Sequence, residues 1–195
     1  MFKDNSGYSP KDLQFDDEGR LRLIEGVTKM SKAVKSTLGP SGQTVLIESP
    51  NHTHGITVTK DGVTVAKAVD LIDPVENLAV RMMKEASDRT ASEAGDGTTT
   101  AIVLTEALVC SFYDNIDRHG STNTTEALRH LGKYTQDIIK HLEGISEPLT
   151  DKRLLDVATI SSNNDTAVGE IIAKVYKAVG KDGIVTVENS QSSET

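Results

Sequence analysis

The sequence contains few of the residues on which several kinds of site depend. It has one cysteine, Cys110, and no tryptophan, and aromatic residues occupy 4% of its 195 positions. A single cysteine excludes an intrachain disulfide framework and a cysteine-rich zinc site, and it fits a reducing compartment. The scarcity of aromatic rings argues against stacking on bases or sugars as the main activity.

Basic residues and long apolar runs are scarce as well. The 21 Lys and Arg residues, against 29 Asp and Glu, give a formal net charge of −8. Such a chain is a poor candidate for nonspecific binding to nucleic acids or anionic membranes. No segment reaches the ~18 consecutive apolar residues of a transmembrane helix, and the polar N-terminus lacks the apolar core of a secretory signal. We therefore expect a cytoplasmic protein that binds neither nucleic acid nor membrane.

Two long segments in the first half of the chain have apolar residues at helical spacing. Steps of three and four residues predict a helix over 16–38, with one of two aspartates as its cap and Gly39-Pro40 as its end. Asp73-Pro74 opens a second helix, which Gly95 ends. The expected apolar stripe of this second helix is Val75, Leu78, Ala79, Met82 and Ala86.

Three further helices follow. The segment 98–110 is apolar on nearly every side, which predicts central burial. The segment 124–144 is amphipathic, and the polar cluster Ser161–Asp165 is expected to cap a helix over 166–179.

Short stretches with alternating or β-branched residues predict a small amount of strand. Leu13 and Phe15 alternate with polar neighbours, and the segments 44–48 and 56–60 flank a turn-rich stretch typical of a β-hairpin. A last strand is expected at 183–188, without a partner nearby in the sequence. The fold class predicted from these elements is mainly α with small β elements (α+β).

The most informative motif is GDGTTT at 95–100, which runs from the end of one predicted helix into the start of the next. A helix N-terminus presents N–H groups and partial positive charge, so it favours anions, and glycine lets the backbone approach a ligand. Asp96 would repel a bound phosphate by ~4 kcal/mol at an effective dielectric near 20, and Mg²⁺ between the two would reverse that sign. A tight turn followed by a helix cap also explains the same residues, so the motif by itself leaves both interpretations open.

The remaining motifs are weak when taken singly. TLGP at 37–40 indicates the end of a helix, and Lys60-Asp61-Gly62 indicates an ordinary turn. His52 and His54 are expected to be solvated residues of the hairpin tip, and Cys110 to be a buried, inert thiol.

The motifs become specific when they are taken in order. The chain carries KDLQF at 11–15, TLGP at 37–40, TKDG at 59–62, GDGTTT at 95–100, TISSN at 159–163 and GIVTVE at 183–188. In this order and spacing the sequence resembles a group I chaperonin of the GroEL type, from about Lys11 to Glu188. Lys60 within TKDG and the GIVTVE segment are more similar to group I than to the archaeal and eukaryotic cytosolic group.

The resemblance implies how the domains are divided. Residues 1–143 would form the N-terminal half of a GroEL-like helical equatorial domain with a β-hairpin, which binds ATP. Residues 144–195 would form the N-terminal arm of an α+β intermediate domain and would end where the apical domain starts. The composition change near Gly144–Pro148 supports this boundary.

The resemblance also implies a nucleotide site with ATP or ADP, Mg²⁺ and, as a further candidate ion, K⁺. Asp96 would hold the Mg²⁺ ion, Lys60 would face the phosphates, and Ile160 would lie near the base. Asp61 would have a supporting catalytic role, because the family's main catalytic carboxylate comes from a part of the subunit absent from this sequence. The residues expected to contact the nucleotide are Thr37, Leu38, Gly39, Pro40, Lys60, Gly62, Gly97, Thr98, Thr99, Thr100 and Ile160.

The partners implied are identical subunits in a ring and, for the intact subunit, non-native polypeptides and a co-chaperonin. The sequence departs from the family pattern at Ser41, where a lysine is usual, in the polar extension 1–10 and in a slightly longer hairpin tip. The apical domain and the C-terminal half of the equatorial domain are absent from the sequence.

The favoured hypothesis is an ATP-dependent chaperonin subunit that assists protein folding in a ring. The alternative is a truncated or split chaperonin fragment that lacks ATPase and folding activity by itself. A third interpretation, an unrelated helical phosphate-binding domain, has little support from the order of the motifs.

Overall fold

The computed structural model describes residues 11–39, 41–48, 55–119, 123–180 and 183–188. The predicted polar extension at 1–10, the hairpin tip with His52 and His54, and Pro40 lie outside these residues. The chain divides into two compact units, residues 1–122 and 123–195.

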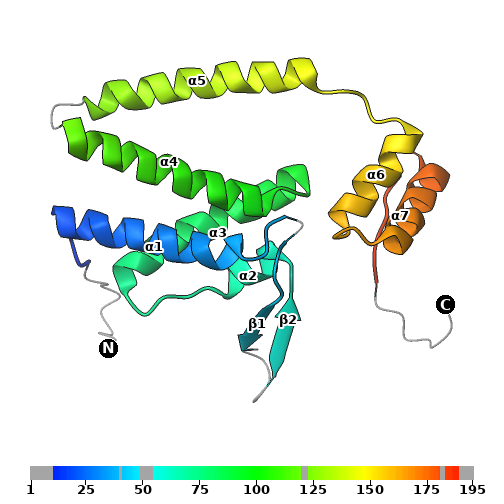
Figure 1. Cartoon of the computed structure of the whole chain (residues 1–195), viewed down its shortest axis with the longest axis horizontal. Coiled ribbons are helices and arrows are strands. Elements are labelled where there is room, and N and C mark those ends of the chain that lie inside the picture. The colour runs from blue at the N-terminus through cyan, green and yellow to red at the C-terminus, as the bar shows by residue number, and fades with distance from the viewer. Residues whose placement is uncertain (1–10, 40, 49–54, 120–122, 181–182, 189–195) are drawn as a thin grey trace, which may run out of the picture. The chain divides into compact units, whose positions relative to one another are not determined.

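The first unit contains four helices and a two-stranded sheet among its described residues (Figure 1). The order is α1 (Asp17–Lys35), β1 (Val45–Glu48), β2 (Ile56–Thr59), α2 (Gly62–Ala68), α3 (Pro74–Ala94) and α4 (Thr98–His119). The strands form the predicted antiparallel hairpin, with Val45 opposite Thr59 and Glu48 opposite Ile56. The mainly helical fold with a small sheet confirms the predicted fold class.

The core of this unit lies where α1, α2, α3 and α4 meet. It is built from small and medium apolar side chains: Val27, Met30, Val34, Val65, Ala66, Ala79, Val80, Met83 and Ile102. Side chains of this size allow the helices to approach closely, which is how interiors reach crystal-like packing density.

The buried face of α3 differs from the expected stripe. Val80 and Met83 are buried, whereas the predicted core residues Leu78 and Met82 are exposed. The physical reason lies at Glu76, which is 8% exposed and accepts hydrogen bonds from Lys29 Nζ at 2.6 and 2.7 Å. This ion pair turns a charged residue toward α1, so the apolar face rotates by about one position.

The expectation that the helix at 98–110 is buried on all sides was wrong. Ile102 is 1% exposed, but Leu104 and Leu108 on other faces of α4 are more than half exposed. Helices α1, α2 and α3 contact α4, but they leave more than half of Leu104 and Leu108 uncovered. The apolar surface of α4 is therefore larger than the other helices of this unit cover.

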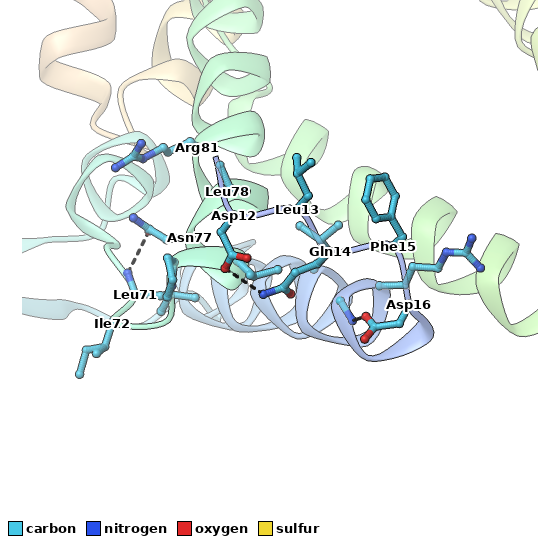
Figure 2. Close-up of a pocket in the computed structure, with 15 residues that line it drawn as sticks. Asp12, Leu13, Gln14, Phe15, Asp16, Leu71, Ile72, Asn77, Leu78 and Arg81 are labelled. Carbon is cyan, nitrogen blue, oxygen red and sulfur yellow. Dashed lines mark hydrogen bonds between the residues drawn. The ribbon is translucent and has the colours of Figure 1, made fainter. Parts of the chain in front are cut away.

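Neither of the two short end strands is present. Residues 11–15 and 183–188 have no regular secondary structure. Leu13 and Phe15 point to one side of the segment, and Asp12 and Gln14 to the other (Figure 2). The side chains therefore alternate as in a strand, but a strand also needs backbone pairing, and no described segment pairs with either stretch.

Two boundaries near the motifs also differ from the predictions. Helix α1 ends at Lys35, four residues before Gly39, and Asp16 is its cap, accepting from Gly19 N at 2.9 Å. The predicted turn at Lys60-Asp61-Gly62 is the start of α2, a short helix that sequence periodicity missed because it has only seven residues.

Helices α1 and α3 touch through their backbones at Gly26. A Cβ added at Gly26 would lie closer than 3.0 Å to the carbonyl oxygen, carbonyl carbon and Cα of Glu76, a separation that real Cβ atoms essentially never show. Since the obstacle is backbone rather than a movable side chain, the two helices would have to separate. Glycine at this position therefore sets the distance between α1 and α3.

Gly26→Ala should destabilise the protein by about 1–3 kcal/mol, the usual cost of overpacking a core. The matched control is Gly132→Ala on α5, where an added Cβ meets nothing within 4 Å. Alanine should stabilise that helix by roughly 0.5–1 kcal/mol. Urea unfolding followed by circular dichroism measures both, and equal effects of the two substitutions would contradict the close approach of α1 and α3.

The start of α3 is fixed by the carboxylate of Asp73. It accepts hydrogen bonds from the backbone N–H groups of Val75 at 2.9 Å and Glu76 at 3.0 Å, and it forms an ion pair with Arg22 of α1. The N–H of Glu76, followed by the Arg22 guanidinium, holds the pKa of Asp73 below its usual range. The charged form is thus favoured by folding.

Asp73→Asn should make the acid limb of the stability curve shallower. A depressed carboxyl pKa contributes stability that is fully present above the unfolded pKa, about 3.9, and is lost as pH falls through the folded value. Asparagine keeps the capping oxygen but not the charge, so the stability gap to the parent should be present at pH 7 and shrink at pH 2–3. Urea midpoints at pH 7, 4 and 2.5 measure this, and a gap that does not depend on pH would contradict it.

The second unit contains α5 (Thr124–Ile145), α6 (Asp151–Ser161) and α7 (Thr166–Val179) among its described residues. Helices α6 and α7 pack together at Gly169, where an added Cβ would overlap Thr159. Asp165 caps α7 as predicted from the Ser161–Asp165 cluster, and α6 is a helix that sequence analysis missed. The predicted amphipathic helix over 124–144 is confirmed as α5, which has no buried residue.

Candidate functional site

Three of the sequence motifs meet at Gly62 in the first unit. A Cβ added at Gly62 would lie closer than 3.0 Å to Thr99 Oγ1 and 3.2 Å from Thr37 Oγ1. These residues belong to TKDG, GDGTTT and TLGP, which are far apart in the sequence. Gly62 is buried between the two hydroxyls, so the absence of a side chain here lets the three loops converge.

The TLGP loop follows the end of α1 in a compact turn. Thr37 Oγ1 donates to the carbonyl of Val34 at 2.8 Å, and Gly39 has a positive φ of 74°. The N–H of Gly42 donates to Gly39 O at 2.9 Å, which closes the turn, and Leu38 is left 45% exposed. Of the four predicted residues here, Thr37 reaches Gly62, whereas Pro40 lies outside the described residues.

Asp61 caps the first turn of α2. Its carboxylate accepts from Val63 N at 3.2 Å, Thr64 N at 2.9 Å and Thr64 Oγ1 at 2.6 Å. Partial burial raises the pKa of Asp61, but the Thr64 side chain and backbone, Val63 N and Lys67 lower it further, so the net pKa is below its usual value. Asp61 is therefore a carboxylate at neutral pH, a hydrogen-bond and cation acceptor rather than an acid. Lys60 beside it is exposed.

The GDGTTT loop joins α3 to α4 through two glycines in the left-handed region. Gly95 has φ of 75° and ends α3, and Gly97 has φ of 86°. Asp96 is exposed, and its Oδ1 accepts from Gly97 N at 2.6 Å. A side chain at either glycine would be strained, so the backbone direction between the helices depends on both.

The three threonines after Gly97 have different environments. Thr98 is buried, Thr99 is half-buried against Gly62, and Thr100 is exposed. All three occupy the first turn of α4, where N–H groups lack intrahelical carbonyl partners and the helix dipole favours negative charge. Their hydroxyls and amides can bind the oxygens of an anion such as a phosphate.

The donor set of these loops fits a hard divalent cation. It consists of the Asp61 and Asp96 carboxylates and threonine hydroxyls, and oxygen ligands of this kind suit Mg²⁺. In the described part of the chain, no three His, Cys, Asp or Glu side chains are grouped so that they could hold a metal by themselves. A cation at this site would therefore also need oxygens from a bound phosphate or water.

Ile160 stays a prediction. It lies at the end of α6 in the second unit, where it is 65% exposed and lines a small cavity between α6 and α7. The other predicted site residues belong to the first unit.

A separate cavity of about 780 Å³ lies in the first unit, lined by residues 12–16 and by parts of α1 and α3 (Figure 2). Asn77 Oδ1 accepts from Leu71 N at 3.0 Å at its edge. None of the predicted site residues lines this cavity.

Comparison with known proteins identifies the family. The family model for TCP-1/cpn60 chaperonins matches residues 30–194. The chain belongs to the TCP-1/cpn60 chaperonin family. The match spans all the motifs from TLGP to GIVTVE.

Solved chaperonin structures have the same fold. Chaperonin gp146 from bacteriophage EL 2 (Pseudomonas aeruginosa), crystallised in the presence of ATP-BeFx in two forms, is 30% identical, with TM-scores of 0.70 and 0.73 over 83% and 84% of this chain. A group III chaperonin in the open state is 25% identical, with a TM-score of 0.68 over 83% of this chain. The chain spans 28% of the length of gp146 and 32% of that of the group III protein.

No described helix is both long enough and apolar enough to cross a membrane. The apolar residues of α5 alternate with charged ones such as Arg129, Lys133 and Asp137.

Gly62→Ala should destabilise the protein by about 1–3 kcal/mol because the added methyl group overlaps Thr99. Thr99→Ala removes the overlapping hydroxyl, so the double variant should recover part of the loss, with a coupling of roughly 0.5–2 kcal/mol. A double-mutant cycle of urea unfolding measures the coupling. Strict additivity of the two substitutions would show that Gly62 and Thr99 are not in contact.

Proposed function

We propose that this chain is the N-terminal part of an ATP-dependent chaperonin subunit, and that the convergence of three loops at Gly62 forms its nucleotide-phosphate site. The observation that carries the proposal is the contact of Gly62 with Thr99 and Thr37, since it brings TKDG, GDGTTT and TLGP together. The presence of ATP-BeFx with the similar gp146 supports the choice of a nucleotide as ligand.

Each loop has its own task in this proposal. The first turn of α4 binds phosphate oxygens through its N–H groups and the hydroxyls of Thr98, Thr99 and Thr100. Exposed Lys60 approaches the phosphates and offsets their charge. The TLGP loop, with Leu38 half exposed, contacts the rest of the nucleotide.

The acidic residues of the site have a complementary role. Asp96 holds Mg²⁺ and, when bound, the ion neutralises the phosphate charge that the carboxylate would otherwise repel. The carboxylate of Asp61 is held by the backbone N–H groups of Val63 and Thr64, stays ionised and lies close to the reacting phosphate in this proposal. Asp61 supports the reaction, while the carboxylate that activates water belongs to a later part of the subunit.

The whole subunit is proposed to act in a ring of identical subunits in the cytoplasm. ATP binding and hydrolysis there would switch the ring between states that hold and enclose non-native polypeptides, with a co-chaperonin. The TKDG and GIVTVE motifs favour the group I type among chaperonins.

A second candidate is a chaperonin fragment without activity of its own. It is favoured by apolar surface that the described structure leaves uncovered on α4 and α5, including Leu104, Leu108, Ile138 and Leu142. Such surface promotes association. This candidate predicts that the 195-residue chain self-associates and hydrolyses no ATP.

Asp96→Asn should weaken ATP binding in the presence of Mg²⁺ by about tenfold or more, equivalent to ~1.4 kcal/mol, because a metal ligand is lost. Binding measured with EDTA should change little, since no ion is then held. Asp137→Asn on exposed α5 is the matched control for the loss of one negative charge. Isothermal titration calorimetry with ATP measures all three proteins.

Two results would contradict the proposal in different ways. If the parent chain binds no ATP, these residues do not form a nucleotide site by themselves, and the second candidate, an inactive chaperonin fragment, is favoured. If the parent chain binds ATP and Asp96→Asn does not change the affinity measured with Mg²⁺, residues other than Asp96 must hold the ion.

A further inference from the structure

A buried polar contact joins α1 to α4 close to the candidate site. Ser31 Oγ donates to Glu106 Oε2 at 2.9 Å, and Lys35 Nζ forms an ion pair with the same oxygen. Ser31 is 0% exposed and the Glu106 side chain 13% exposed, whereas Lys35 is 44% exposed. One carboxylate thus holds two residues of α1 from a single position on α4.

The position of Glu106 on α4 relates it to the site. Thr99, Ile102 and Glu106 are spaced by three and four residues, so they lie on one face of the helix. Thr99 and Glu106 are seven positions apart, which is about two turns or 10 Å of helix. Ile102, 1% exposed in the core, lies between them.

On α1 the residue that contacts Glu106 comes before the site residue in the chain, whereas on α4 Glu106 comes after Thr99. Lys35 is the last residue of α1, and Thr37 follows it by two positions. Glu106 contacts Lys35 two turns along α4 from the point where Thr99 and Thr37 meet Gly62. The two helices therefore run antiparallel, with the end of α1 and the start of α4 on the same side (Figure 1).

We propose that Glu106 is a positioning residue: by holding Ser31 and Lys35 it fixes α4 against α1 so that Thr99 and Thr37 stay in place around Gly62. The inference rests on the proposed function, because it assigns the distance between two loops of the nucleotide site to a contact outside it. A small shift of α4 matters there, since Thr99 and Gly62 have no spare space.

The charge state of Glu106 agrees with this role. Partial burial raises the pKa of the Glu106 carboxyl, but the hydrogen bonds from Lys35 and then Ser31, together with the Lys35 charge, lower it further, and the net pKa lies below its usual value. Glu106 is therefore an acceptor for both partners throughout the physiological pH range. Removal of the carboxylate leaves the buried Ser31 hydroxyl without its acceptor. The free-energy cost of an unsatisfied buried hydroxyl exceeds the net stabilisation that its hydrogen bond provides.

A second ion pair on α1 supplies the matched control. Lys29 binds Glu76 of α3, whose side chain is 10% exposed, much as Lys35 binds Glu106. Both pairs join α1 to a neighbouring helix, but Glu76 contacts neither α4 nor any of the three loops that meet at Gly62 in the described interactions. Loss of stability is common to both pairs, whereas an effect on the site is expected from Glu106 alone.

The test compares Glu106→Ala, Glu106→Gln and Glu76→Ala in the full chain. Glu106→Ala should weaken ATP binding with Mg²⁺ by about tenfold, because displacement by a fraction of an ångström degrades a multidentate site. Glu106→Gln keeps one acceptor oxygen and should recover most of the affinity, and Glu76→Ala should change it less than about twofold. Calorimetry is performed where circular dichroism shows all variants folded.

A readout without nucleotide separates this inference from the proposed function. In two-dimensional NMR spectra, the Gly62 amide and Thr99 methyl resonances should move in Glu106→Ala and stay in place in Glu76→Ala. If they move as expected while the parent chain binds no ATP, the positioning role stands and the proposed function fails. Unmoved resonances in Glu106→Ala, or equal losses of affinity in both alanine variants, would overturn the positioning role.

Discussion

The structure of the first unit depends on how closely its helices and loops can approach one another. Two glycines, which no larger residue could replace without moving a neighbour, set these distances. At Gly26 the backbone of α1 lies against the backbone of α3, and at Gly62 the start of α2 lies against Thr99 and Thr37. In both places the space of one methyl group is already occupied. The core between these contacts consists of valine, alanine, methionine and isoleucine, whose size suits helices at short separation.

Charged residues then fix the orientation of helices that apolar packing alone leaves adjustable. Three carboxylates, Asp73, Glu76 and Glu106, reach from α3 or α4 to basic residues of α1. Each is partly buried and hydrogen-bonded, so its loss removes a directional contact between helices, and loss of Glu106 also leaves the buried Ser31 hydroxyl without its acceptor. Directional contacts of this kind specify one rotation of each helix, which non-directional burial does not. The loops that follow these helices inherit that orientation.

The uncovered apolar residues of α4 and α5 have a different meaning. The described residues leave Leu104 and Leu108 of α4 more than half exposed and bury none of the apolar face of amphipathic α5. The chain covers 28% of the length of gp146, a chaperonin with the same fold. Exposed apolar residues gathered on helix faces favour contact with further protein.

The sequence determined the motifs of the candidate site, the hairpin, the cap at Asp73 and the chaperonin family, because these depend on local spacing and motif order. It also indicated the polar clusters that cap α1 and α7, and the structure singled out Asp16 and Asp165 within them. It misplaced the buried face of α3 and overstated the burial of α4, since an ion pair at Glu76 and the number of neighbouring helices are not visible in periodicity. It also predicted end strands at 11–15 and 183–188, whose formation requires a pairing partner. Only the tertiary structure showed that three separate motifs meet at Gly62 and that Glu106 holds α1, because those contacts join residues tens of positions apart.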